Sequence, residues 1–164
     1  SLFTTSWLRV YTSADVLGVE LAGALKNVIA IAAGITDGLG AGNNAKAALL
    51  TRGLKEMVRF GTALGGEEAT FYGLAGLGDL LATAYSLHSR NRMAGESLVR
   101  GVDREALEAR GVVEGLYAVK AMVAWGKEQG AELPVAEAVH RVAHEGLDPL
   151  AALKALMARE PKEE

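Results

Sequence analysis

The sequence has 164 residues, of which 50% are hydrophobic and 23% charged, so the chain is long enough and apolar enough to bury a sizeable core. A formal net charge of −3 at pH 7 excludes a strongly basic protein of the kind that binds nucleic acids or anionic membranes in general. The lack of cysteine excludes disulfides and thiolate metal sites, and it is typical of a reducing compartment.

Aromatic residues make up only 5% of the sequence, so Leu, Val, Ile and Ala must form most of the core, which favours close-packed helices. No secretory signal is recognisable. The uncharged run between Lys26 and Asp37 is shorter than the about 20 residues that a membrane-spanning helix needs. We therefore expect a cytoplasmic protein that does not insert into membranes.

Residues 8–12 differ from the rest of the chain, because Leu-Arg-Val-Tyr-Thr is a short β-like run without an obvious partner strand. A lone strand cannot satisfy its backbone hydrogen bonds. No Gly-x-Gly-x-x-Gly motif follows a strand, so the sequence encodes no dinucleotide-binding fold. We interpret residues 1–12 as the tail of a preceding domain that this chain lacks, and residues 13–164 as one helical domain.

From residue 13 onward, apolar side chains that recur every three or four residues predict only helices. Asp15 is a candidate cap for the first helix, and Asn43 and Asn44 are candidate caps for the second. The predicted helices span residues 15–35, 45–64, 80–85, 89–101, 113–130, 134–146 and 148–157, with one more short helix capped by Asp103. Residues 70–79 are expected to form a glycine-rich connection.

The first predicted helix carries two polar residues, Lys26 and Asn27, inside its apolar pattern. The face of Lys26 continues through Gly23, Ala30 and Ala33, which are all small. Small neighbours let a ligand or another backbone approach the amine, and an amine deprived of water is a candidate proton donor. The alternative is a lysine whose stem lies along the core while its amine reaches solvent.

Ser89, Arg90 and Asn91 open a later helix and form a second candidate site. Free backbone N–H groups at a helix start favour anions. The planar guanidinium of Arg90 can also bind a phosphate in bidentate fashion. The alternative is an ordinary polar helix N-terminus.

Asp79 follows the glycine-rich connection and begins a short helix. Its carboxylate has two candidate roles, as a cap of that helix or as a partner that orients Lys26, and one oxygen could serve each. Thr83 lies one helical turn later and shares the face of Asp79. The alternative for Thr83 is a core hydroxyl with a satisfied hydrogen bond.

Three further motifs carry weaker signals. The glycines of residues 38–42 resemble a phosphate loop but lack the Lys-Ser/Thr that follows one, which favours a tight helix connection. His140 and His144 have the spacing of paired metal ligands, but no third ligand is evident, so we expect no metal site. Val112 and Glu114 precede a helix, where Glu114 would complement the helix dipole.

Taken together and in this order, several segments resemble NAD(P)-dependent glycerol-3-phosphate dehydrogenase of the bacterial type. The resemblance covers residues 8 to about 157. It is carried by residues 18–28 (GVELAGALKNV), 37–40 (DGLG), 48–54 (ALLTRGL), 73–80 (GLAGLGDL) and 89–92 (SRNR). One position departs from the family pattern, because Ala84 stands where a cysteine is common.

The resemblance implies an all-α, C-terminal substrate-binding and catalytic domain, similar in fold to the C-terminal domain of 6-phosphogluconate dehydrogenase. The N-terminal Rossmann domain of such an enzyme is absent from this chain. Lys26 resembles the catalytic lysine, which accepts a proton when glycerol 3-phosphate is oxidised and donates one to the carbonyl oxygen of dihydroxyacetone phosphate in reverse. Asp79 resembles the carboxylate beside it.

The resemblance also implies binding roles. Substrate would contact Lys26, Asn27, Asp79, Thr83, Ser89, Arg90 and Asn91, and NAD(P)H would contact Arg90, Val112 and Glu114. The missing Rossmann domain would hold most of the cofactor, so the 164-residue chain alone is expected to be inactive. That domain and a second copy of the chain are the candidate protein partners, and the reaction would supply glycerol phosphate for phospholipid synthesis.

Two alternatives stay open at this point. The first is a related helical-domain dehydrogenase that acts on another hydroxy acid. The second is a non-enzymatic helical oligomerisation module, in which Lys26, Asp79 and Arg90 would lie scattered in space.

Overall fold

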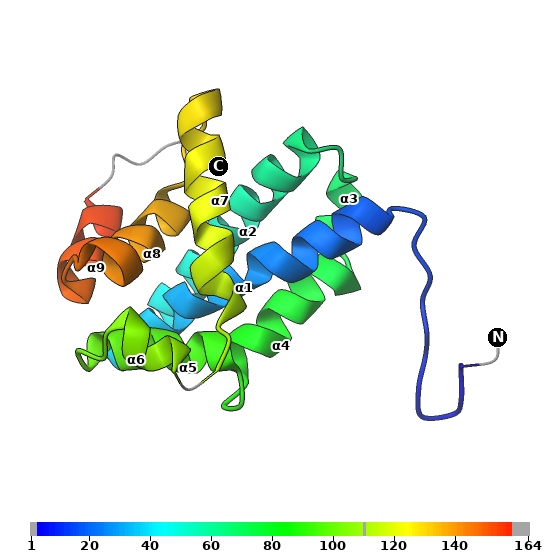
Figure 1. Cartoon of the computed structure of the whole chain (residues 1–164). Coiled ribbons are helices and arrows are strands. Elements are labelled where there is room, and N and C mark those ends of the chain that lie inside the picture. Colours follow the sequence, from blue (N-terminus) through cyan, green and yellow to red (C-terminus); the bar gives the residue numbers. More distant parts are fainter. Residues whose placement is uncertain (1–2, 110, 159–164) are drawn as a thin grey trace.

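Residues 3–109 and 111–158, which are those that the computed structural model describes, form helices and no strand. This confirms the predicted all-α class. The helices are α1 (Val16–Gly38), α2 (Asn43–Ala63), α3 (Glu68–Tyr72), the π-helix η1 (Leu74–Gly78), α4 (Asp79–Tyr85), α5 (Arg90–Val99), α6 (Arg104–Glu108), α7 (Glu114–Gln129), α8 (Pro134–Glu145) and α9 (Pro149–Met157) (Figure 1).

Helix α1 runs through the middle of the molecule, and α2, α4, α5, α7 and α8 pack around it (Figure 1). Every residue from 28 to 36 is buried, which explains why this helix shows no polar face in its second half. By length and composition α1 is the one described helix that could cross a membrane. The central helix of a folded domain passes the same test, and the burial of its second half favours that role.

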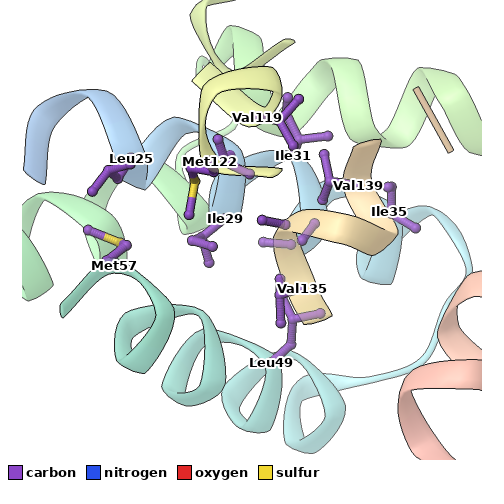
Figure 2. Close-up of a cluster of buried hydrophobic side chains, with 14 of the residues drawn as sticks. Leu25, Ile29, Ile31, Ile35, Leu49, Met57, Val119, Met122, Val135 and Val139 are labelled. Carbon is purple, nitrogen blue, oxygen red and sulfur yellow. The ribbon is translucent and has the colours of Figure 1, made fainter. Parts of the chain in front are cut away.

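The core forms where side chains of α1 meet those of α2, α7 and α8 (Figure 2). Ile29 and Met57 are fully buried, and so are Met122 and Val139. These are flexible or branched aliphatic side chains, as the low aromatic content predicts. Removing several methylene groups from such a site costs about 2–5 kcal/mol of stability.

Helices α1 and α5 cross with their backbones in contact because glycine lies on both sides of the crossing. A Cβ atom at Gly34 would collide with the backbone carbonyl of Arg92, and one at Gly95 would collide with the backbone carbonyl of Ile31. Any side chain at these positions would push the helices apart. The two glycines therefore set how close the start of α5 lies to the helix that carries Lys26.

The expected glycine-rich connection at residues 70–79 is helical, so this prediction is wrong. Phe71 is fully buried and anchors α3, and a Cβ atom at Gly76 would collide with the backbone of Phe71. The glycines permit this close backbone approach and the wide turn of η1, which leads directly into α4. Local glycine content predicted a loop, whereas tertiary packing stabilises a turn of helix.

The helix starts were predicted with mixed success. The side chains of Asp15 and Asp103 cap α1 and α6 as expected. The second helix begins at Asn43 itself, with Gly42 as its cap and no capping side chain, so the capping role predicted for Asn43 and Asn44 is wrong. Residues 8–12 form no strand, and the segment before α1 extends away from the helices (Figure 1).

Candidate functional site

Lys26 of α1 donates a hydrogen bond to the carboxylate of Asp79 at the start of α4. The lysine side chain is 17% exposed and the aspartate side chain 43%, so the pair lies at the edge of the core rather than deep within it. Asp79 does not cap α4, because η1 continues into α4 without a break and the N-terminal cap position is Gly78. The predicted capping role is wrong, and the predicted contact with Lys26 is confirmed.

Thr83 lies on the same face of α4, and its hydroxyl donates to the second carboxylate oxygen of Asp79 at 3.4 Å. One oxygen of Asp79 therefore accepts from Lys26 and the other from Thr83. This arrangement fixes the rotation of the carboxylate, and through it the direction of the lysine amine. Lys26 is thus held at the surface of the domain by a partner of opposite charge.

Asn27, the neighbour of Lys26, connects α1 to α5 and α7. Its side-chain amide donates to the backbone carbonyl of Gly23 at 3.1 Å, and its oxygen accepts from the side-chain amide of Asn91 at 2.8 Å. The oxygen of Asn91 accepts in turn from the backbone N–H of Gly115 at 2.9 Å. Asn91 is buried, and these bonds satisfy its polar atoms.

Ser89 caps α5, because its hydroxyl accepts from the backbone N–H of Arg92 at 3.2 Å. Arg90 and Glu114 form an ion pair at 2.9 Å, and both side chains are about half exposed. The other oxygen of Glu114 lies 3.4 Å from the amide of Asn91. The structure therefore joins the predicted substrate-binding residues of α5 to one predicted cofactor-binding residue.

An open cleft of about 320 Å³ lies between the end of α4, the start of α5 and the start of α7. It is lined by Ala82, Thr83, Ser86, His88, Ser89, Arg90, Asn91 and Glu114. Larger hollows of about 830 and 700 Å³ lie elsewhere and contain none of the predicted site residues. The small cleft is therefore the candidate binding site, because it is where the predicted polar groups converge.

Lys26 and Asp79 are not among the residues that line this cleft, but both adjoin it. Asp79 contacts Thr83 of the cleft wall, and Asn27 beside Lys26 contacts Asn91. Val112 stands apart on the connection before α7, where its side chain is exposed. The predicted residues thus form a connected group, with Val112 at its exposed margin.

The sequence analysis missed a second group of charged residues, none of which lines the cleft. Asp37 contacts Lys46 and Arg92, and Arg92 also contacts Glu96. Lys46 and Arg92 are buried. A signal was present, since a charged residue within the apolar face of a helix usually has a partner, but the partner could not be identified before the helices were packed.

The paired histidines do not form a metal centre among the described residues, which contain no group of three potential ligands. The His140 and His144 rings lie 5.0 Å apart. His144 is held by the backbone carbonyl of Leu116 at 2.9 Å, and burial lowers its pKa. The contact with Leu116 gives His144 a structural role between α7 and α8.

Comparison with known proteins shows the family of this chain. Residues 15–154 match the family model of the NAD-dependent glycerol-3-phosphate dehydrogenase C-terminus. The chain is 88% identical to glycerol-3-phosphate dehydrogenase [NAD(P)+] of Thermus thermophilus and 52% identical to that of Clostridium botulinum, over its whole length in both cases. It spans 51% and 50% of those two proteins, so it corresponds to about half the length of the curated relatives it matches.

Solved structures show the same fold. The crystal structure of glycerol-3-phosphate dehydrogenase from Coxiella burnetii aligns with 92% of this chain and 47% of its own, at a TM-score of 0.85 and 49% identity. The enzyme from Saccharomyces cerevisiae aligns with 96% of this chain and 47% of its own, at a TM-score of 0.84 and 32% identity. The chain therefore belongs to the NAD-dependent glycerol-3-phosphate dehydrogenase family and corresponds to its C-terminal domain.

Proposed function

We propose that this chain is the catalytic and substrate-binding part of an enzyme that interconverts dihydroxyacetone phosphate and sn-glycerol 3-phosphate with NAD(P)H. The observation that carries the proposal is the contact of Lys26 with Asp79, connected through Thr83 to a cleft that holds Arg90. A non-enzymatic module would leave these three residues scattered. Their grouping supports an active site.

Lys26 is the proposed acid and base. Reduction of a ketone builds negative charge on the carbonyl oxygen, and a positioned ammonium group neutralises that charge and supplies a proton. Such general acid catalysis contributes roughly 10²–10⁴-fold to the rate. In the reverse direction the amine of Lys26 accepts the proton of the substrate hydroxyl, and Asp79 keeps that amine in place in both directions.

Arg90 is the proposed phosphate-binding residue. Its guanidinium lies at the open cleft and pairs with the half-exposed Glu114, so a phosphate can reach it from solvent. The phosphate is remote from the bond that changes, and its binding energy serves to orient the carbonyl at Lys26. Ser89, Asn91 and Asn27 add neutral hydrogen-bonding groups around the same substrate.

The proposed cofactor contacts are Arg90, Glu114 and Val112. Arg90 and Glu114 offer a cation and a carboxylate at the cleft, and Val112 offers an exposed apolar side chain on the connection before α7; these groups suit the charged, hydroxylated and apolar parts of a nicotinamide dinucleotide. The cofactor supplies the hydride when it is bound. We propose that a Rossmann domain outside this chain holds most of the cofactor, and that residues 1–12 belong to its end.

The wider setting follows from the same proposal. The substrates are small water-soluble phosphates, which fits a cytoplasmic enzyme that is not inserted in a membrane. Its product would serve glycerophospholipid synthesis. A homodimer is the proposed assembly, to be checked by measuring the mass of the full-length protein in solution.

The proposal is tested by assaying the full-length protein. NADH or NADPH absorbance is followed with dihydroxyacetone phosphate, with dihydroxyacetone and with a panel of oxo acids that lack phosphate. We expect turnover with dihydroxyacetone phosphate alone, and no turnover by the 164-residue chain. Turnover of an oxo acid in preference to dihydroxyacetone phosphate would overturn the proposed substrate and identify a dehydrogenase of another hydroxy acid.

A further inference from the structure

We propose that Arg92, held by Asp37 and Glu96, is a positioning residue that fixes the first turn of α5 and thereby the substrate-binding residues 89–91. We call this group the Asp37 cluster; its members are Asp37, Lys46, Arg92 and Glu96. The inference rests on the proposed function, because it concerns how that site is held in shape. None of the four residues lines the cleft itself.

The Asp37 cluster ties three helices together through short hydrogen bonds. One oxygen of Asp37 accepts from the amine of Lys46 and from the Nε atom of Arg92, each at 2.7 Å. The terminal guanidinium nitrogen of Arg92 donates to Glu96 at 2.7 Å. Two cations and two anions are paired, so the charges of α1, α2 and α5 balance within the cluster.

Burial makes this pairing obligatory. The side chains of Lys46 and Arg92 are 4% and 10% exposed, and that of Asp37 is 22% exposed. A charge removed from water is tolerated only when its partners have good geometry. A shift of α5 relative to α1 would separate Arg92 from Asp37, so the cluster opposes such a shift.

The cluster also reaches the helix that carries Asp79. The amine of Lys46 lies over the ring of Tyr85, 4.3 Å from its centre. Tyr85 is the last residue of α4, whose first residue is Asp79 and which also bears Thr83. The four residues and Tyr85 thus bring together α1, α4 and α5, the helices that carry Lys26, Asp79 and residues 89–91.

Arg92 is fixed through its backbone as well as its side chain. Its N–H is bound by the capping hydroxyl of Ser89, and its carbonyl lies against Gly34 of α1. Arg90 and Asn91 fill the two positions between the cap and Arg92, so their backbone can move only if these contacts break. A first turn held in this way presents the phosphate-binding group in one orientation and spares the substrate the cost of ordering it.

The test measures Arg92→Met in the full-length enzyme. We expect the KM for dihydroxyacetone phosphate to rise about tenfold or more, with kcat changed less than threefold, because Lys26 and Asp79 lie on other helices. Arg92→Lys keeps one charge beside Asp37 and should recover part of the KM. A KM within twofold of wild type in folded Arg92→Met would overturn the inference.

Two control variants separate positioning from stability. Arg52→Met removes the same kind of side chain from α2, where it is exposed and outside the Asp37 cluster, and should leave KM and thermal stability unchanged. Glu56→Gln alters a buried carboxylate between α2 and α8 and should change stability while KM stays at the wild-type value. If Glu56→Gln raised KM as much as Arg92→Met, the role of Arg92 would be general stability and the inference would fail.

Hydrogen exchange of the full-length protein supplies a readout that needs no substrate. We expect the amides of residues 90–93 to exchange about tenfold faster in Arg92→Met than in wild type, and at the wild-type rate in Arg52→Met. Unchanged exchange would overturn the inference even if the enzyme were inactive. Inactivity of wild type towards dihydroxyacetone phosphate would instead refute the proposed function. Should Arg92→Met not fold, Arg92→Lys takes its place. We then expect the KM or the exchange rate of residues 90–93 to rise about threefold, and no rise in either quantity would overturn the inference.

Discussion

The amine of Lys26 donates a hydrogen bond to the carboxylate of Asp79, which lies 53 residues later in the chain and on a different helix. Neither helix alone explains both residues, since α1 carries mostly apolar side chains around Lys26 and Asn27, and α4 needs no cap at Asp79. The two side chains come into contact only when α1 and α4 pack together. This contact gives the domain an oriented amine next to a cleft.

Asp79→Asn tests whether the carboxylate orients that amine. The asparagine keeps the size of the side chain but loses the charge, so Lys26 is held less firmly. We expect kcat of the full-length enzyme to fall by about 10- to 100-fold, since small misplacements of a reacting group have effects of this size. Steady-state kinetics measure kcat of the Asp79→Asn variant, and Asp103→Asn serves as the control. Asp103 caps α6 outside the site, and a matching loss of kcat in that variant would contradict the account.

Arg90→Ala tests the phosphate contact. Loss of a charge-assisted hydrogen bond should raise the KM for dihydroxyacetone phosphate by about 10- to 100-fold. Any residual rate with dihydroxyacetone, which has no phosphate, should be unaffected. Arg52→Ala removes an exposed arginine from α2 and serves as the control. An equal loss against both substrates in Arg90→Ala would show that the residue does not act on the phosphate.

Gly23→Ala tests whether the open space one turn before Lys26 is kept for a ligand. A Cβ atom at Gly23 would meet nothing within 4 Å in this chain, so packing does not require glycine there. Alanine is the better helix former by about 0.5–1 kcal/mol, and thermal stability should not fall. We expect a raised KM for substrate or cofactor instead, because the added methyl group enters the approach to the amine.

Gly53→Ala is the matched control within helix α2. A Cβ atom at Gly53 would press on the side chain of Ile29, so this variant should melt at a lower temperature with its KM unchanged. If the Gly23→Ala variant kept the wild-type KM values, the space at Gly23 would not serve to admit a ligand.

Glu56 of α2 should make the stability of the domain depend on pH. Its carboxylate accepts the backbone N–H groups of Val135 and Ala136 at 2.6 and 3.0 Å, which caps α8 from a neighbouring helix. Burial raises its pKa from the ordinary value of 4.5 to about 7, against the lowering effect of those two hydrogen bonds. The folded protein therefore holds this proton more tightly than the unfolded chain does.

The sign of the effect follows from that difference. As pH rises from 4.5 to about 7, the free energy of unfolding contributed by Glu56 falls by about 3 kcal/mol, and it stays level at higher pH. Denaturant unfolding of the full-length protein between pH 4.5 and 8 measures this fall in the free energy of unfolding. We expect the Glu56→Gln variant to lose this part of the slope. Parallel curves for the two proteins would show that Glu56 does not titrate in this range.

The sequence offered the contact between Lys26 and Asp79 as one of two roles for that carboxylate, and the family resemblance indicated the same partner. It did not predict that Lys46 and Arg92 share Asp37, because that choice of partner depends on how three helices pack. The turn at Gly76 was also missed. Glycine disfavours helix locally, yet the close contact with Phe71 stabilises a helical turn that no local pattern indicates.

Replacement of Lys26 by methionine in the full-length enzyme is the most direct test of the central claim, that this amine transfers the proton. The account predicts a fall in kcat of roughly 10²–10⁴-fold with nearly unchanged affinity for the cofactor. Lys55→Met, at an exposed lysine of α2, should retain full activity. A folded Lys26→Met enzyme that turns over at the wild-type rate would contradict the account.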